Sequence, residues 1–418
     1  MPLVRDFKPT EHISPIIGYS LVLFFLGVGD SLMSYSTPIY IESKVNSAFL
    51  MGIILSTSSL FGMFLDFIIS KKFWNRKYVF FIKLAFLTTL FFPLILIFMP
   101  GKPLFFVMAM LTWGAYYEFK GFSNFNFIHK HMSPDKHALA WSILNTFNSI
   151  AYFIGPMISV LLLEIGEKTS FYAAILPFAV AALTFHFFRK KFHGASDTEG
   201  INLLQQQEEK NIVLETGIIK SLISRAWPMV IFGASLWLLD SSFWTIGTLY
   251  SQELKEVNRL GSFFFAAYMI PPIFTSLLAP HIYSRFGKKK TAFTAALVSA
   301  LMLLIMSIST NIIFILVCVF LVSVFSNLAL ILNYAVFEDF VARLNRYGND
   351  MVAMEQISAS LAYVIGPVLL GYISTLVGYQ HTFSFVGILI GSISIACLVA
   401  VPRKIKMPQM ELKHLNSN

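Results

Sequence analysis

The segment Ala151-Tyr152-Phe153-Ile154-Gly155-Pro156 recurs 211 residues later as Ala362-Tyr363-Val364-Ile365-Gly366-Pro367. A second match lies at nearly the same offset, because Asp30-Ser31 recurs as Asp240-Ser241. Two independent matches at nearly one offset indicate an internal repeat rather than chance. The chain is therefore predicted to consist of two parallel repeats, an architecture typical of membrane transporters whose substrate site lies near the bilayer midplane between the repeats.

The composition indicates that lipid surrounds most of the chain. Of the 418 residues, 56% are apolar and only 13% are charged, and the mean hydropathy is +0.70. These values exclude a soluble enzyme and a disordered chain. A helix needs about 20 mostly apolar residues to cross the hydrocarbon core, and twelve such stretches occur. The predicted spans are 15–41, 47–70, 78–99, 103–128, 138–163, 169–188, 226–251, 260–283, 291–309, 312–337, 355–377 and 380–402.

The predicted fold is an all-α membrane protein with twelve transmembrane helices in two pseudo-symmetric six-helix bundles. Continuous apolar stretches, without two-residue alternation, favour helices over a barrel. A polar segment containing QQQEEK separates spans six and seven and reads as a linker. The predicted organisation is an N-terminal bundle at 1–188, a cytoplasmic linker at 189–225, a C-terminal bundle at 226–402 and a cytoplasmic tail at 403–418.

The net charge of +9 is explained by topology. Of the 31 Lys and Arg residues, 24 fall in the tails and the loops that share their side, and five fall on the opposite face. Because cytoplasmic loops retain basic residues, we expect a multi-pass protein of the cell (plasma or inner) membrane with both termini cytoplasmic. This distribution argues against nucleic acid as a partner.

The sequence shows no recognisable arrangement of catalytic or metal-binding residues. Cys318 and Cys397 lie inside apolar stretches, and the nine histidines lack metal-ligand spacing. No Gly-rich phosphate loop and no catalytic Ser, His and Asp set can be assembled. We therefore predict no enzyme activity, no cofactor and no metal.

A few ionisable residues lie inside the predicted spans, where each costs at least about 2.5 to 3.5 kcal/mol and so needs a cavity, a partner or a proton. Asp30 and Asp240 lie near the middle of spans one and seven, and Glu118 and Lys120 lie in span four. Glu118 is about 160° from Lys120 around the helix, so it should face neighbouring helices and not pair with Lys120. Asp30, Asp240 and Glu118 are predicted proton-coupling residues, the alternative being fixed structural pairs.

The loops after spans two and eight carry a motif that resembles the major facilitator superfamily, which typically has Gly-x-x-x-Asp-Arg-x-Gly-Arg-Arg there. The first half has Gly62 and Asp66, with the basic part displaced to Arg76, and the second has Arg285 and Gly287, with Ser in place of Asp. The resemblance covers nearly the whole chain and implies that these residues form a conformational latch. Alternatively, Asp66 only ends its helix and the basic run only sets topology.

The Gly155-Pro156 and Gly366-Pro367 pairs resemble the span-five motif of the antiporter branches of this family, which implies a helix pivot. Ala151, Ser159 and Val160 replace further glycines of that motif, so the pairs could equally be a packing feature.

In this family, spans one, four, seven and ten line a central cavity, and polar and aromatic side chains share those faces here. The family's arrangement leaves an ion pair between Lys120 and Asp30 open. Aromatic rings there could stack on flat or cationic substrates, although each could equally be packing. The predicted substrate-cavity residues are Ser34, Trp113, Tyr117, Lys120, Asn124, Trp237, Trp244, Asn327 and Tyr334.

The resemblance implies a secondary active transporter that moves a small organic solute by alternating access. The Gly-Pro pairs favour proton-coupled export. Antiporters of that branch carry Arg four residues before a span-four Gly, whereas Tyr117 precedes Gly121 here, so proton-symport uptake of a polar metabolite is an alternative. A non-transporting receptor or scaffold is a third possibility. The expected partners are a small-molecule substrate, protons and the lipid bilayer, and we expect a monomer.

Overall fold

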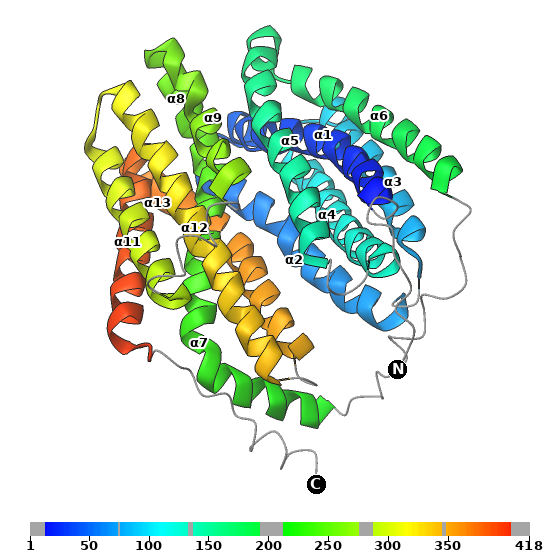
Figure 1. Ribbon diagram of the computed structural model, residues 1–418. Coiled ribbons are helices and arrows are strands. Elements are labelled where there is room, and N and C mark those ends of the chain that lie inside the picture. The colour runs from blue at the N-terminus through cyan, green and yellow to red at the C-terminus, as the bar shows by residue number, and fades with distance from the viewer. Residues whose placement is uncertain are drawn as a thin grey trace, which may run out of the picture. The chain divides into compact units, whose positions relative to one another are not determined.

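The first half of the chain forms six long helices. The computed structural model describes residues 13–73, 76–132, 137–192, 212–275, 287–344 and 348–402, and all regular structure within these ranges is helical (Figure 1). The six helices correspond one to one with predicted spans one to six. Their bounds are α1 (Ile13–Val45), α2 (Ala48–Lys72), α3 (Tyr78–Phe98), α4 (Pro103–His131), α5 (His137–Ile165) and α6 (Thr169–Phe192).

The second half is less regular. Predicted span seven is the end of α7 (Ile212–Ser242), a π-helical turn η2 (Phe243–Gly247) and α8 (Thr248–Val257). The π-turn begins three residues after Asp240, and such turns often occur at functional sites. The remaining elements are η3 (Arg259–Phe263), α9 (Phe264–Met269), α11 (Lys288–Ile308), α12 (Ile312–Leu344) and α13 (Gly348–Ala400). Residues 276–283 of predicted span eight lie outside the described residues.

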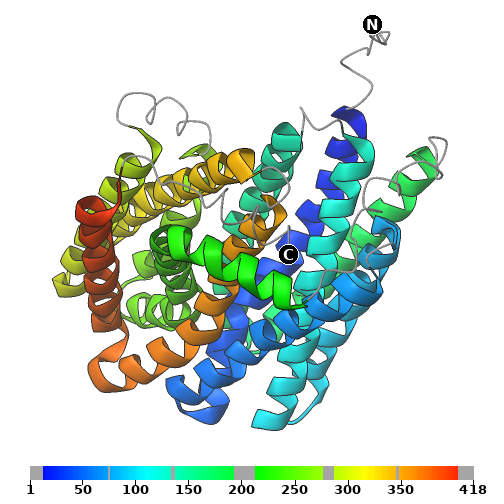
Figure 2. The same cartoon turned by 90° about the horizontal axis from the view of Figure 1, so that it is seen from below.

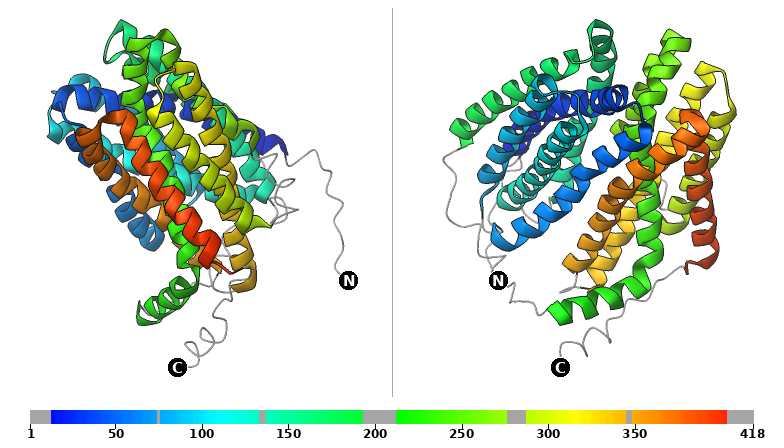
Figure 3. Two further views of the ribbon diagram at one scale, coloured as in Figure 1. Left: turned by 90° about the vertical axis from the view of Figure 1, so that its left-hand side faces the viewer. Right: turned by 180° about the vertical axis from the view of Figure 1, so that it is seen from behind.

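Helix α13 comprises two predicted spans. Its 53 residues are interrupted at Gly378, whose φ of 82° and ψ of 166° are not helical. Glycine tolerates this backbone conformation because it lacks a Cβ, and the chain folds back at this point (Figures 2 and 3). The break lies between predicted spans eleven and twelve. Among the described residues, nine helices are long and apolar enough to cross a membrane, and the last of them comprises predicted spans eleven and twelve.

The chain divides into two compact units. Unit 1 comprises Met1–Ser36 and Phe61–Gln205, and unit 2 comprises Thr37–Leu60 and Gln206–Asn418. In unit 1, α3 packs against α4 and α6, and in unit 2, α7 packs against α13 and α11 packs against α12 and α13. Residues 37–60 group with unit 2 because the start of α2 lies close to α13. A methyl group on Gly52 would lie 2.0 Å from the carbonyl oxygen of Pro367, and one on Gly371 would lie 2.4 Å from that of Ala48.

Candidate functional site

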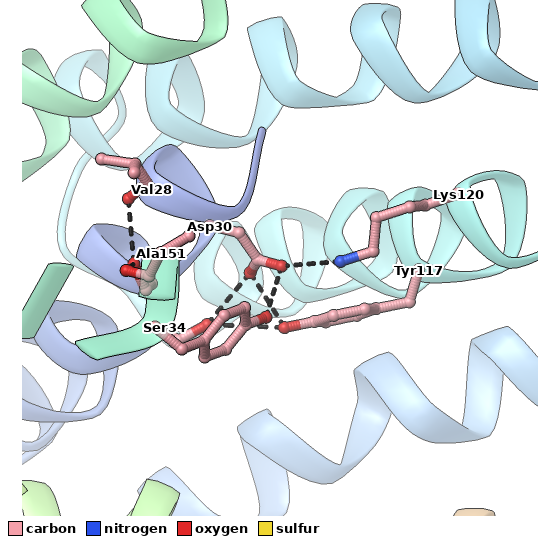
Figure 4. Close-up of polar contacts among 8 residues, drawn as sticks. Val28, Asp30, Ser34, Tyr117, Lys120 and Ala151 are labelled. Atoms are coloured by element: carbon pink, nitrogen blue, oxygen red, sulfur yellow. Dashed lines mark hydrogen bonds and ion pairs between the residues drawn. The ribbon is translucent and has the colours of Figure 1, made fainter. Parts of the chain in front are cut away.

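A fully buried carboxylate, Asp30, lies at the centre of a polar cluster in unit 1. Ser34 Oγ and Tyr117 OH donate to its Oδ1 at 3.1 and 2.9 Å. Lys120 Nζ and Tyr152 OH donate to its Oδ2 at 3.0 and 2.6 Å. Figure 4 shows Lys120 and Tyr117 extending from the same side of α4 toward Asp30. The structure thus contains the Lys120–Asp30 ion pair that the family's arrangement left open.

These four donors satisfy both oxygens of Asp30, since an ionised carboxylate offers about four acceptor positions. The ammonium group of Lys120 also lies over the rings of Tyr116 and Tyr117, at 4.8 and 5.0 Å from their centroids, which adds cation–π attraction. Asp30 has no exposed surface, whereas Tyr117 is 37% exposed. The cluster therefore neutralises a buried charge.

The repeated motif builds the contact between α1 and α5 that holds this cluster. Ser31 Oγ donates to the carbonyl of Ala151 at 3.0 Å, and Ser159 Oγ donates to that of Leu32 at 3.2 Å. A methyl group on Gly155 would lie 1.8 Å from Ser31 Oγ, so only glycine allows this approach. Two residues that depart from the family's glycines, Ala151 and Ser159, thus take part in interhelical hydrogen bonds.

The same contact recurs in unit 2 between α7 and α13. Tyr268 OH donates to Oδ1 of Asp240 at 2.8 Å, and Tyr363 OH donates to its Oδ2. A methyl group on Gly366 would lie 2.7 Å from Ser241 Oγ. The two units therefore share one pattern. The tyrosine of the Ala-Tyr-x-Ile-Gly-Pro motif donates to the aspartate of the Asp-Ser motif, and the glycine of the first motif lies against the serine of the second.

The electrostatics of the two clusters differ. Among the described residues no Lys or Arg pairs with Asp240, and Asp240 is partly exposed. A second carboxylate in unit 2, Glu355 on α13, is 9% exposed and accepts only a long hydrogen bond from Trp237 Nε1 at 3.4 Å. Tyr334 on α12 is 36% exposed.

Sequence reasoning missed several of these residues. Glu355 stands at the boundary of predicted span eleven, where an acidic residue looks like a helix end. Tyr268 gave no signal because a tyrosine in an apolar stretch resembles packing. Tyr152 and Tyr363 did carry a signal, because they recur at nearly the same offset as Asp30 and Asp240.

Glu118 faces the neighbouring helix α2, as the helix geometry predicts. A methyl group on Gly62 would lie 2.8 Å from Glu118 Oε1. Asp66, one turn further along α2, interacts electrostatically with Glu118. Gly62 and Asp66, which are predicted for the latch, therefore lie beside Glu118, which is predicted for proton coupling. This side of α4 is away from Lys120.

The other predicted latch residues lie near helix ends. Arg76 is exposed, stands 5.3 Å from the ring of Phe80, and accepts a hydrogen bond at its carbonyl from Asn126 at 3.2 Å. Gly287 caps the start of α11 with a φ of 82°, and Arg285 lies outside the described residues. Lys288 Nζ, next to Gly287, forms an ion pair with Asp339 Oδ1 at 2.7 Å.

Of the remaining predicted cavity residues, Trp113 and Asn124 in unit 1 lie in packed surroundings. Trp113 is 6% exposed and its ring stacks on those of Phe92 and Tyr116, with centroids 4.1 and 4.9 Å away. Asn124 Oδ1 accepts a hydrogen bond from Tyr19 at 3.0 Å.

Two further predicted cavity residues lie in unit 2. Asn327 donates to the carbonyl of Ser323 within α12 at 2.9 Å. The ring of Trp244 in η2 lies 5.2 Å from that of Phe265. Trp237, by contrast, donates a hydrogen bond from its indole nitrogen to Glu355.

No group of three or more His, Cys, Asp and Glu side chains with metal-binding geometry occurs in the described ranges. Both cysteines are buried thiols.

Comparison with known proteins supports the predicted family. The model described as Major Facilitator Superfamily matches residues 242–413. A crystal structure of the peptide transporter POT in complex with sulfate has a TM-score of 0.72 and 16% identity, over 96% of both chains. A POT family transporter in complex with 5-aminolevulinic acid has a TM-score of 0.70 and 13% identity, over 92% of this chain and 95% of the other. The nucleoside transporter NupG has a TM-score of 0.68 and 13% identity, over 91% and 98%. No curated protein matches the sequence.

Proposed function

We propose that the chain, whose residues 242–413 match the Major Facilitator Superfamily model and whose fold is that of solved transporters, exports a small organic solute in exchange for protons. It would do so by alternating access, with Asp30 as the principal coupling residue and Asp240 and Glu118 as further candidates. The observation that carries this proposal is the Asp30 cluster, a fully buried carboxylate paired with Lys120 at 3.0 Å. Such a pair is stable only while both partners stay charged, so protonation of Asp30 would release Lys120 and change the contacts between α1 and α4.

A second candidate function is uptake of a polar metabolite by proton symport. Tyr117, which stands where the antiporter branches have Arg, donates to Asp30. Two structural neighbours are described as complexes with 5-aminolevulinic acid and with a thioalcohol-conjugated peptide. Those are polar compounds, which favours a polar solute for this chain as well.

Three further roles belong to this proposal. Gly62, Asp66, Arg76, Arg285 and Gly287 would stabilise one conformational state as a latch, and the Gly-Pro pairs of α5 and α13 would act as pivots. The protein would work as a monomer in the cell membrane, with both termini in the cytoplasm.

The test begins with a ligand. A thermal-shift screen of the purified protein against metabolites and drug-like compounds identifies binders, because any ligand specific for the native state stabilises it. Flux of the best binder is then measured in inverted membrane vesicles with an imposed pH gradient, for the wild type, Asp30→Asn and a control, Asp339→Asn. We expect accumulation when the interior is acid, its loss in Asp30→Asn, and its retention in Asp339→Asn.

The outcomes separate the alternatives. Accumulation driven by the opposite gradient would replace export with symport. Gradient-driven flux that is unchanged in Asp30→Asn would remove Asp30 from coupling. A binder that never crosses the membrane under either gradient would favour the receptor or scaffold.

A further inference from the structure

Tyr152 differs from the other donors to Asp30 in the helix that carries it. Its hydroxyl donates to Oδ2 of Asp30 at 2.6 Å, and Lys120 Nζ donates to the same oxygen at 3.0 Å. Tyr152 belongs to α5, whereas Lys120 and Tyr117 extend from α4 and reach Asp30 with the ends of long side chains (Figure 4). Ser34, the fourth donor, lies on α1 itself. Asp30 therefore connects two helices, α4 and α5, to α1.

The backbone of α5 is fixed against α1 on both sides of Asp30. One turn before Asp30, a methyl group on Gly27 would lie 2.9 Å from Ala151 Cβ. Directly after Asp30, Ser31 Oγ donates to the carbonyl of Ala151 at 3.0 Å, and a methyl group on Gly155 would lie 1.8 Å from Ser31 Oγ. Since these contacts hold the two backbones together, α5 cannot move away from Asp30 without breaking all of them.

The bond between tyrosine and aspartate also forms without a cation. In unit 2, Tyr363 OH donates to Oδ2 of Asp240, and the glycine and serine of the repeated motifs are in contact there as well. Among the described residues, no Lys or Arg forms an ion pair with Asp240. The same helix contact thus carries the same hydrogen bond where no lysine takes part. This indicates that the Tyr152–Asp30 bond does not depend on Lys120.

Protonation of Asp30 would affect its two partners at Oδ2 differently. An ammonium group has three donors and no acceptor, whereas a hydroxyl has one donor and two acceptor lone pairs. Lys120 would therefore lose the negative charge that holds it and could not accept the new O–H. Tyr152 could accept that O–H at the place where it now donates.

The surroundings of Asp30 contain one charged partner. Among the described residues, the titratable side chains that face Asp30 from neighbouring helices are Lys120, Tyr116 and Tyr117 of α4 and Tyr152 of α5. Of these, only Lys120 is charged at neutral pH. The ion pair to α4 is thus the contact that depends on the charge of Asp30.

We propose that Tyr152 is the positioning residue that keeps Asp30 bound to α5 in both its ionised and its protonated form, so that protonation releases α4 alone. In this arrangement α1 and α5 move as one body, and the proton opens the contact between α1 and α4. This inference rests on the proposed coupling role of Asp30 and specifies which helix contact the proton controls.

The first experiment follows protonation of Asp30 in the purified full-length protein by infrared titration. The signal is the carbonyl band of a protonated carboxylic acid that is absent from Asp30→Asn. A hydrogen bond to a carboxylate favours its charged form, so without the hydroxyl the proton should bind at higher pH. We expect the midpoint of this band to rise by about one pH unit in Tyr152→Phe, a tenfold change in proton affinity. Tyr172→Phe, which removes an exposed hydroxyl of α6 in the same unit, should titrate like the wild type.

The second experiment tests the protonated form through the melting temperature. Asp30→Asn imitates a protonated carboxyl, because its amide is uncharged and has both donors and an acceptor. In this background Tyr152→Phe should still lower the melting temperature, since a hydrogen bond is lost. Lys120→Met should not lower it, since no negative charge remains to hold the cation. Elution volume verifies that each variant folds.

The proposal is wrong if the midpoint in Tyr152→Phe equals that of the wild type, or if Tyr152→Phe has no effect in the Asp30→Asn background. An Asp30 that stays ionised at every pH would also overturn it. Flux separates these results from the proposed function. An unshifted midpoint together with gradient-driven flux that Asp30→Asn abolishes would retain coupling by Asp30 and remove the role of Tyr152. A shifted midpoint without gradient-driven flux would retain the positioning by Tyr152 and remove the proposed coupling.

Discussion

At the scale of single residues, the stability of the Asp30 cluster depends on complete pairing. Isolated charges in a low-dielectric interior are costly, and a buried ion pair offsets that cost only when other hydrogen bonds satisfy the remaining acceptor positions. Ser34, Tyr117 and Tyr152 supply those bonds. The cluster therefore tolerates removal of both charges better than removal of one.

Lys120→Met tests this point, because it leaves Asp30 buried and without its cation. Breaking a buried pair from one side typically costs about 3 to 5 kcal/mol, so we expect a marked fall in the melting temperature of the detergent-purified protein. The double variant Asp30→Asn with Lys120→Met should recover much of that loss, since no unpaired charge remains. Equal melting temperatures for the single and double variants would show that the pair contributes no coupling energy.

At the scale of elements, two close helix contacts organise the units. In unit 1, Ser31 of α1 lies against Gly155 of α5, and in unit 2, Ser241 of α7 lies against Gly366 of α13. Small residues let helix backbones approach, which is the main source of helix association inside a membrane. The repeated sequence therefore packs two helices closely together in each unit. A pivoting role for the same residues stays a prediction.

Gly155→Ala should disrupt the α1–α5 contact. The added methyl group would lie 2.6 Å from Ser31 Cβ and 3.0 Å from the backbone nitrogen of Leu32, and a backbone atom cannot move aside as a flexible side chain can. We expect a destabilisation of about 1 to 3 kcal/mol, measured as a lower melting temperature. Gly121→Ala is the matched control, since nothing lies within 4 Å of its added methyl group. A control as unstable as Gly155→Ala would contradict the packing argument.

Element positions followed from the sequence because hydrophobic length and turn residues are local signals. The break at Gly378 lies between the predicted bounds of spans eleven and twelve. The π-turn after Asp240 left no such signal. Tertiary partners were harder still. Lys120 could be matched to Asp30 because charges inside a membrane need partners, whereas Glu355 at a predicted helix end and the neutral donor Tyr268 follow no comparable rule.

At the scale of the whole molecule, the same aspartate–tyrosine contact occurs in two units whose neighbouring side chains carry different charges. Each unit joins a motif aspartate to a motif tyrosine. Unit 1 then supplies its own cation and unit 2 supplies a second carboxylate. Repetition thus retains the helix packing, and divergence at positions outside the motifs, Lys120 and Glu355, changes how the carboxylates of each unit are paired.

The distribution of basic residues predicts the orientation of the whole chain, and this prediction is open to a direct test. Because 24 of the 31 Lys and Arg residues should face the cytoplasm, the turn between α11 and α12 should face outward and the start of α11 inward. The two native cysteines are buried, so an exposed engineered thiol dominates labelling. We expect Thr310→Cys to react with a membrane-impermeant maleimide in intact cells, and Lys290→Cys to react only after permeabilisation. Both positions are exposed, so the opposite pattern would invert the topology and, with it, the direction of transport inferred from inverted vesicles.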